Sequence, residues 1–384
     1  MRVYLDHNST TPIREEVRDR LFELLDEGLG NASGTHSSGR RARAILDDAR
    51  ELVATSLDVP ESWVVFTSGG TEANNHALKG CMRGKLPGDL AVSVAEHPSV
   101  LETADELLRR GHGLQRLAVD REGALDLEQL RNYLKRPNLR LLSCMLANNE
   151  TGALLAVEEV AQLLREEGSA APLWHVDGVQ ALGKIPLSIR EWGVDLMSLS
   201  AHKIGGPQGV GVLVRRPDTG LANLLQGGGQ ESGARSGTEN VAGIGAAALA
   251  IELAVREQAT FATQMRELSE ELWTSLHQHL PSTKRVGPGA DSDRLPNTVN
   301  VLFEGMDGRS LVARLDLEGL ETSLGSACSS GAIEPSHVLL AMGYTPEEAR
   351  SGLRLSLGRT TTHKDIHRAV DILGKVVQSM TTKR

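Results

Sequence analysis

The chain has 384 residues, which is more than one ordinary hydrophobic core accommodates, so we expect two domains. Its composition, 40% hydrophobic and 24% charged residues, is typical of a soluble globular protein. The net charge of −9 argues against direct nucleic-acid binding, which favours a basic face.

Residues 16–255 alternate between short apolar segments and amphipathic segments. This alternation predicts βαβ units around a largely parallel sheet that is buried on both faces. We assign residues 15–256 to this large α/β domain. The expected strands are 63–68, 89–97, 139–150, 172–178, 195–203 and 209–216.

The pattern changes at residue 238. Residues 238–280 contain no proline and carry apolar residues at helical spacing, which predicts one or two long helices. A strand at 298–305 and a helix at 307–319 follow. We therefore expect a smaller α+β domain over residues 257–384, joined by the N-terminal segment 1–14.

The stretch "SLSAHKIGGPQG" (198–209) places Lys203 at the end of a buried strand. A lysine charge is costly to bury, so this side chain is either a solvated loop lysine or an amine that loses its proton for carbonyl chemistry.

Other polar residues follow the expected strands, at the edge where α/β sheets bind ligands. "TSGGTEANN" brings Gly70 and Thr71 to the start of a helix, where backbone N–H groups can bind a phosphate. "EHPSV" places His97 after a strand, where imidazole can stack on a ring or move protons. An ordinary strand–turn–helix connection and a structural histidine are the alternatives.

Two further strand ends carry amides and a carboxylate. "NNETG" contains Asn149, which can donate to an oxygen anion or cap a turn. "HVDGVQALGK" contains Asp177 and Gln180; the buried aspartate needs a donor or cation, or else caps a helix. Together the strand ends favour a ligand with a phosphate, a ring nitrogen, a hydroxyl and an aldehyde. Pyridoxal 5'-phosphate has all four.

The sequence resembles the cysteine desulfurases of the class V aminotransferase family, in the NifS/IscS-like group. The resemblance implies the fold type I of pyridoxal-phosphate-dependent transferases, with a mainly parallel seven-stranded sheet between helices and a smaller α+β domain. It rests on these stretches, which occur in family order: "YLDHNSTTP", "FTSGGTEANN", "EHPSV", "NNETG", "HVDGVQALGK", "SAHKIGGPQGVG", "GGGQESGARSGTEN", "GSACSSG" and "LRLSLGRTTT".

By this resemblance, Lys203 binds the cofactor covalently and His97 stacks on its ring. Asp177 holds the ring nitrogen, and Gln180 and Asn149 lie near the phenolic oxygen.

The resemblance also implies a phosphate site made of Gly70, Thr71, Ser200 and His202. Thr238 would reach the phosphate of the neighbouring subunit, so a homodimer is expected.

For the substrate, L-cysteine, the resemblance implies Arg354 as the carboxylate ligand, with Asn149 and Asn31 beside it. Cys328 would accept the sulfur as a persulfide, with Lys203 and His97 as the other catalytic residues. The expected products are L-alanine and sulfur for an acceptor or scaffold protein, as in iron–sulfur cluster assembly or thiolation.

The cysteines are too widely spaced for a disulfide framework or a zinc site, so we expect no metal and a reducing, cytoplasmic setting. No apolar run is long enough for a membrane span. Cys328, among small polar residues, suits a reactive thiol, whereas Cys144 suits an inert core thiol within a strand. Alternatives are a selenocysteine lyase, another class V aminotransferase or lyase, and a non-catalytic sulfur-relay scaffold.

Overall fold

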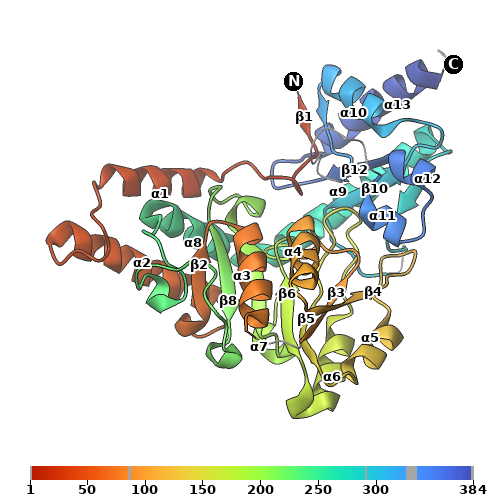
Figure 1. The fold of residues 1–384 in the computed structure, drawn as a ribbon. Helices are drawn as coiled ribbons and strands as arrows, with labels where there is room; N and C mark the ends of the chain where they lie inside the picture. The colour runs from red at the N-terminus through yellow and green to blue at the C-terminus, as the bar shows by residue number, and fades with distance from the viewer. Residues whose placement is uncertain (1, 85–87, 290–291, 326–334, 382–384) are drawn as a thin grey trace.

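A computed structural model describes residues 2–84, 88–289, 292–325 and 335–381. Within these ranges the chain forms a large lobe around one sheet and a smaller lobe that contains both described chain ends (Figure 1). No helix in the described ranges is both long and apolar enough to cross a lipid bilayer.

The large lobe contains a seven-stranded sheet of order β2-β8-β7-β6-β5-β3-β4. Strand β8 is antiparallel to both of its neighbours, and the other pairs are parallel. The predicted mainly parallel α/β sheet is therefore confirmed. The strands are β2 (Val64–Thr67), β3 (Asp89–Ser93), β4 (Gly113–Leu117), β5 (Leu139–Ser143), β6 (Leu173–Asp177), β7 (Leu196–Ser200) and β8 (Gly211–Arg215).

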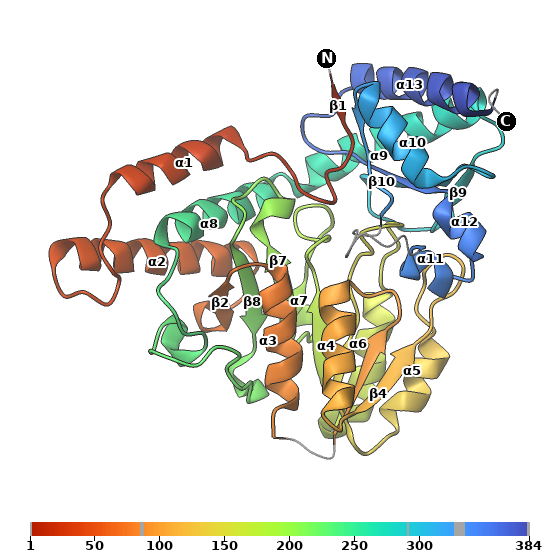
Figure 2. The same ribbon diagram turned by 45° about the horizontal axis from the view of Figure 1, so that its top comes forward.

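Helices cover both faces of this sheet because successive strand residues point to opposite sides. In β2, Val65 packs in the core under α3 (Gly70–Met82) and α4 (Pro98–Arg109), and Phe66 packs in the core of the opposite face. Figure 2 shows α3 and α4 side by side in front of the sheet. The helices of the other face are α2 (Ser37–Ser56), α5 (Leu127–Leu134), α6 (Val157–Glu167), α7 (Ile189–Trp192) and α8 (Val241–Arg256), with α1 (Glu15–Asp26) packed on α8.

The small lobe has its own core. An antiparallel sheet of order β12-β10-β9 packs against helices, and β1 (Val3–Tyr4) pairs in parallel with β11 (Leu320–Glu321). Val3 and Leu5 of the N-terminal segment lie in this core. The other elements are α9 (Gln258–His279), β9 (Lys284–Val286), β10 (Thr298–Leu302), α10 (Gly308–Leu317), α11 (His337–Ala341), α12 (Pro346–Arg350), β12 (Gly352–Ser356) and α13 (His363–Thr381).

Several element boundaries differ from those expected. The strands expected at 89–97, 139–150 and 195–203 end at Ser93, Ser143 and Ser200, where the backbone turns toward the polar residues that follow. Cys144 consequently lies just after β5 rather than within it, although it is buried. The long helical stretch is two helices, α8 and α9, which break at Glu257.

Strand β4 was not among the strands expected from the segments. Its sequence, "GLQRL", includes Gln115 and Arg116, and only Leu117 of this edge strand is fully buried. β2, at the other edge, is buried throughout and keeps an apolar run, so it is the partial burial of β4 that removes the sequence signal.

Candidate active site

A cavity of about 340 Å³ lies at the carboxyl ends of the parallel strands, where the two lobes meet. Both lobes line it: Ser323, Gly325 and Arg354 come from the small lobe. The structure brings together there most of the residues singled out in the sequence, namely Gly70, Thr71, His97, Asn149, Asp177, Gln180, Ser200, His202, Lys203 and Arg354.

Lys203 lies in a single 3-10 turn, η3 (Ala201–Lys203), directly after β7. Its Nζ donates hydrogen bonds to the backbone carbonyl oxygens of Asn8 and Ser9, both at 2.7 Å. Burial and, secondly, the nearby Arg354 guanidinium lower the pKa of Lys203 from 10.5 to about 8. The side chain is therefore not a solvated loop lysine but an amine that can lose its proton near neutral pH, as covalent carbonyl chemistry requires.

Asp177 ends strand β6 as a buried carboxylate that makes no ion pair with any described residue. One carboxylate oxygen accepts a hydrogen bond from Asn74 Nδ2 at 2.7 Å, and the other accepts one from the Val179 backbone N–H at 3.0 Å. Both donors are neutral, so the buried charge lacks the opposite charge that normally accompanies it. A protonated ring nitrogen in the cavity would supply that charge.

His97 is held by its own helix. It is the N-cap of α4, and its Nδ1 accepts a hydrogen bond from the Ser99 backbone N–H at 3.1 Å. The Ser99 hydroxyl lies 2.8 Å from the same Nδ1 and accepts from Asn74 Nδ2 at 2.9 Å. With Nδ1 occupied as an acceptor, the neutral ring carries its proton on Nε2. Burial lowers the pKa of His97 and so favours this neutral form.

The opposite end of the cavity has the features of an anion site. Helix α3 begins there with no side-chain cap, and unpaired N–H groups at a helix start attract anions. A Cβ on Gly70 would lie 2.8 Å from Val179 Cγ2, so a larger residue would disturb this end. Thr71, Ser200 and His202 add hydroxyl and imidazole groups to the lining. Burial and the neighbouring Lys203 lower the pKa of His202 to about 4, so its imidazole is neutral.

Arg354, on β12, is buried but reaches the cavity. It forms an ion pair with Asp6 at 2.7 Å and donates to Ser9 Oγ at 2.7 Å and to the Asn149 carbonyl oxygen at 3.0 Å. Its Nε is buried and has no hydrogen-bond partner among the described residues. The guanidinium therefore keeps donor capacity for a carboxylate, and Asp6 fixes its orientation.

Several cavity residues were not predicted from the sequence. Asn8, Asn74, Ser99 and Gly325 lie inside the quoted stretches "YLDHNSTTP", "FTSGGTEANN", "EHPSV" and "GSACSSG", and Asn74 is one helical turn after Gly70, which could have indicated it. Met145 and Ser323 carry no comparable signal.

Three expected residues do not line this cavity. Asn31 is exposed in the loop between α1 and α2, where its side chain accepts from the Ser33 backbone N–H. Thr238 is also exposed and lines a separate cavity with Ser68 and Arg235. Cys328 lies outside the described residues; Gly325, on the same segment, lines the cavity.

Comparisons with known proteins identify the family. The family model described as "Aminotransferase class-V" matches residues 3–369, nearly the whole chain. The chain belongs to the aminotransferase class-V family. Within it, the cysteine desulfurase IscS of Dictyoglomus turgidum is 40% identical over 385 residues, which cover 99% of this chain and 95% of the relative.

Solved structures also resemble this chain over most of its length. A NifS-like protein superposes with a TM-score of 0.92 at 35% identity, covering 99% of this chain and 100% of the other. A structure described as SspA in complex with cysteine superposes with a TM-score of 0.80 at 30% identity, covering 92% of this chain and 98% of the other.

Proposed function

We propose that this class-V chain is a cysteine desulfurase that depends on pyridoxal 5'-phosphate. The observation that carries the proposal is the presence, in one cavity, of the low-pKa amine Lys203 and of the buried carboxylate Asp177, which makes no ion pair with a described residue. The relative from Dictyoglomus turgidum is named a cysteine desulfurase, and SspA is described with cysteine bound; both favour the same substrate here.

The cavity residues fit the proposed cofactor. Asp177 would hold the ring nitrogen, His97 would stack on the ring, and Lys203 would bind the aldehyde. Gly70, Thr71, Ser200 and His202 would surround the phosphate. When bound, pyridoxal phosphate supplies a ring that withdraws the electrons left when the substrate Cα loses a proton.

The chain's own groups then have distinct tasks. Arg354 and Asn149 orient the substrate carboxylate, and the neutral Lys203 amine takes the Cα proton. His97, with its Nε2 proton, is placed for proton transfer at the departing sulfur.

Sulfur transfer requires a nucleophile, for which we propose the Cys328 thiolate. A sulfur–sulfur bond forms as the substrate Cβ–Sγ bond breaks, and Cβ receives a proton. Overall, L-cysteine and the Cys328 thiol give L-alanine and a Cys328 persulfide, so atoms and electrons balance. The persulfide would pass to a cytoplasmic sulfur-acceptor protein, such as an iron–sulfur scaffold.

We also propose a homodimer. Helix α1 projects from the large lobe (Figure 1) and exposes Phe22 and Leu25 at 56% and 59%, an apolar pair that a second copy would cover. Thr238 is exposed and does not line the candidate active-site cavity of its own chain, so it would then be free to reach the phosphate bound in the partner.

Asp177→Asn tests the electrostatic part of this function. The variant should still bind pyridoxal phosphate, but alanine release from L-cysteine should fall at least about tenfold, because a charge-assisted hydrogen bond of roughly 1.5–3 kcal/mol is lost. Alanine is measured by chromatography, and cofactor content by absorbance. Wild type that released no alanine would contradict the desulfurase assignment, and a variant at the wild-type rate would contradict the role of Asp177.

The pKa of Lys203 predicts how the cofactor-free chain captures its cofactor. Only the neutral amine attacks an aldehyde, so the capture rate should rise with pH through about 8 and level off above it. The rate is followed by absorbance after mixing the apoprotein with pyridoxal phosphate. A midpoint near 10.5, the ordinary value for lysine, would show that burial does not lower the pKa of Lys203.

A further inference from the structure

Lys184 is a buried lysine to which the proposed reaction gives no task. It is 4% exposed and makes no ion pair within the described part of the chain. Its Nζ donates to Gln180 Oε1 at 2.6 Å and to Asn8 Oδ1 at 3.1 Å. Burial, with Lys203 and Arg354 nearby, holds the pKa of Lys184 well below its usual value. A buried amine without a counter-charge is costly, so its retention calls for a reason.

The two partners of Lys184 have fixed orientations. Gln180 Nε2 donates to the Asn8 backbone carbonyl at 2.9 Å. Asn8 Nδ2 donates to the Asn149 carbonyl at 3.1 Å and to Thr298 Oγ1 at 2.9 Å. The Asn8 and Asn149 backbone carbonyls can only accept, so each amide turns its NH₂ group toward a carbonyl and its oxygen toward Lys184 Nζ, which donates to both. Rotating the Gln180 amide would set its oxygen against the Asn8 carbonyl oxygen.

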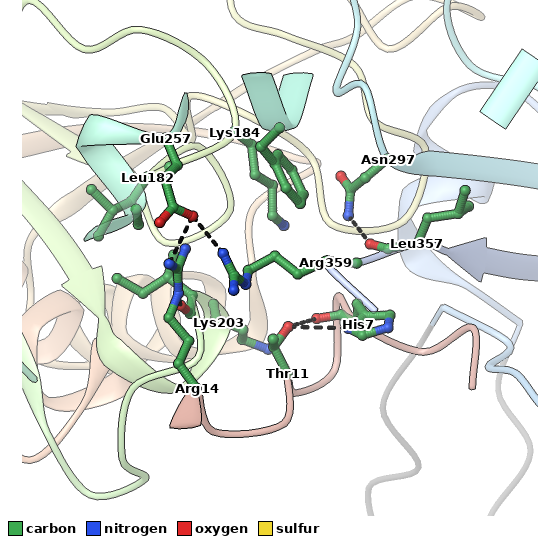
Figure 3. A pocket seen from close by; sticks show the side chains of 15 residues that line it. His7, Thr11, Arg14, Leu182, Lys184, Lys203, Glu257, Asn297, Leu357 and Arg359 are labelled. Atoms are coloured by element: carbon green, nitrogen blue, oxygen red, sulfur yellow. Dashed lines mark hydrogen bonds and ion pairs between the residues drawn. The ribbon is translucent and has the colours of Figure 1, made fainter. Parts of the chain in front are cut away.

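This network continues to the reactive lysine. The Asn8 carbonyl that accepts from Gln180 also accepts from Lys203 Nζ at 2.7 Å. Lys184 and Lys203 additionally line one small cavity of about 30 Å³ between the lobes (Figure 3). Lys184 thus contacts one residue of each lobe that frames the site: Gln180 of the large lobe and Asn8 of the N-terminal segment.

The charged groups around this small cavity do not replace Lys184. Glu257 accepts from Arg14 at 2.9 Å and from Arg359, so the acidic group of the cavity is already shared by two cations (Figure 3). His7 also lines the cavity, and burial lowers its pKa to about 4, so it is neutral.

We propose that Lys184 is a positioning residue of the cofactor site. It locks the Gln180 amide so that the NH₂ group, rather than the oxygen, faces the phenolic oxygen of pyridoxal phosphate, and it fixes Asn8 beside Lys203. This inference rests on the proposed function, since it concerns the same cofactor.

Lys184→Met tests the inference, since methionine is of similar length and lacks the donor. In the protein loaded with pyridoxal phosphate, loss of the donor that fixes the Gln180 amide should raise the midpoint of the pH-dependent absorbance change by about one unit. Affinity of the apoprotein for pyridoxal phosphate should fall about tenfold. Thermal unfolding verifies that the variant folds. Lys184→Gln keeps a donor, so its midpoint should shift less than that of Lys184→Met. The glutamine variant replaces the methionine variant if the latter does not fold.

A double-mutant cycle with Gln180→Ala distinguishes positioning from a purely structural role. If Lys184 acts through Gln180, Lys184→Met should shift the absorbance midpoint much less in the Gln180→Ala background than in wild type. Lys364→Met, at an exposed position on α13, is the matched control and should change nothing. Equal shifts in both backgrounds, or no shift at all, would overturn the inference. Failure of the proposed function is a separate result: wild type would then show no lysine-bound cofactor absorbance.

Discussion

Lys203→Ala is expected to abolish both the absorbance of lysine-bound pyridoxal phosphate and the release of alanine from L-cysteine. No other described lysine both lines the site cavity and stands at the end of a central strand. Lys184, a buried amine beside the site, donates to Gln180 and Asn8 and does not line that cavity. Removing the amine removes both the covalent attachment and the base at Cα, so the loss should be complete rather than partial.

The variant should fold normally, because the two hydrogen bonds that it loses end on carbonyl oxygens of Asn8 and Ser9 that border the cavity and can bind water. Lys135→Ala, at an exposed position after α5, is the control for handling and should keep full activity. A Lys203→Ala protein that retained both normal absorbance and turnover would refute the assignment of the cofactor lysine. Loss of turnover alone, with the absorbance intact, would show that the cofactor is bound to a different amine.

Cys328→Ser should stop sulfur transfer while leaving cofactor binding intact. Cys328 lies outside the described residues, so this prediction rests on the sequence and on Gly325, which precedes it in the chain and lines the cavity. A serine hydroxyl is a far weaker nucleophile toward sulfur than a thiolate. Since Arg354 and Asn149 remain, L-cysteine should still bind and change the cofactor absorbance, but almost no alanine should appear.

Mass spectrometry after exposure to L-cysteine tests where the sulfur goes. Wild type should gain one sulfur atom on the peptide that contains Cys328. Cys81 and Cys144 are buried, and burial raises the pKa of the Cys144 thiol well above its usual range, so neither is expected to gain sulfur. Ser329→Ala, beside the nucleophile, is the control and should keep the persulfide. Added sulfur on Cys81 or Cys144, or wild-type alanine release by Cys328→Ser, would exclude the proposed acceptor.

Activity of Cys328→Ser toward selenocysteine separates the remaining alternatives. A selenocysteine lyase would retain turnover on that substrate, and an aminotransferase would be indifferent to the thiol. A non-catalytic sulfur-relay scaffold would release alanine in no variant, wild type included.

The local sequence was sufficient to predict most of the residues that line the candidate site. Lys203 and His97 follow recognisable strands and Asp177 ends one, and the carboxyl ends of parallel strands meet at one edge of a sheet whatever the loops between them do. The hydrophobic periodicity and the composition were also sufficient to predict the α/β class and a second α+β unit. They failed at β4, because most of this strand is only partly buried and its sequence therefore lacks an apolar run.

Only the tertiary structure decided the pKa values and the charge partners on which the reactivity of these residues depends. The lowered pKa of Lys203 arises from burial and from Arg354, and the described part of the fold gives Asp177 neutral hydrogen-bond donors rather than an ion pair. Asn8 joins Lys203, Lys184 and Gln180 only because β1 pairs with β11 and carries the N-terminal segment between the lobes. Burial and electrostatic environment are sums over residues distant in sequence, so a local motif can name a reactive side chain but cannot set its protonation state.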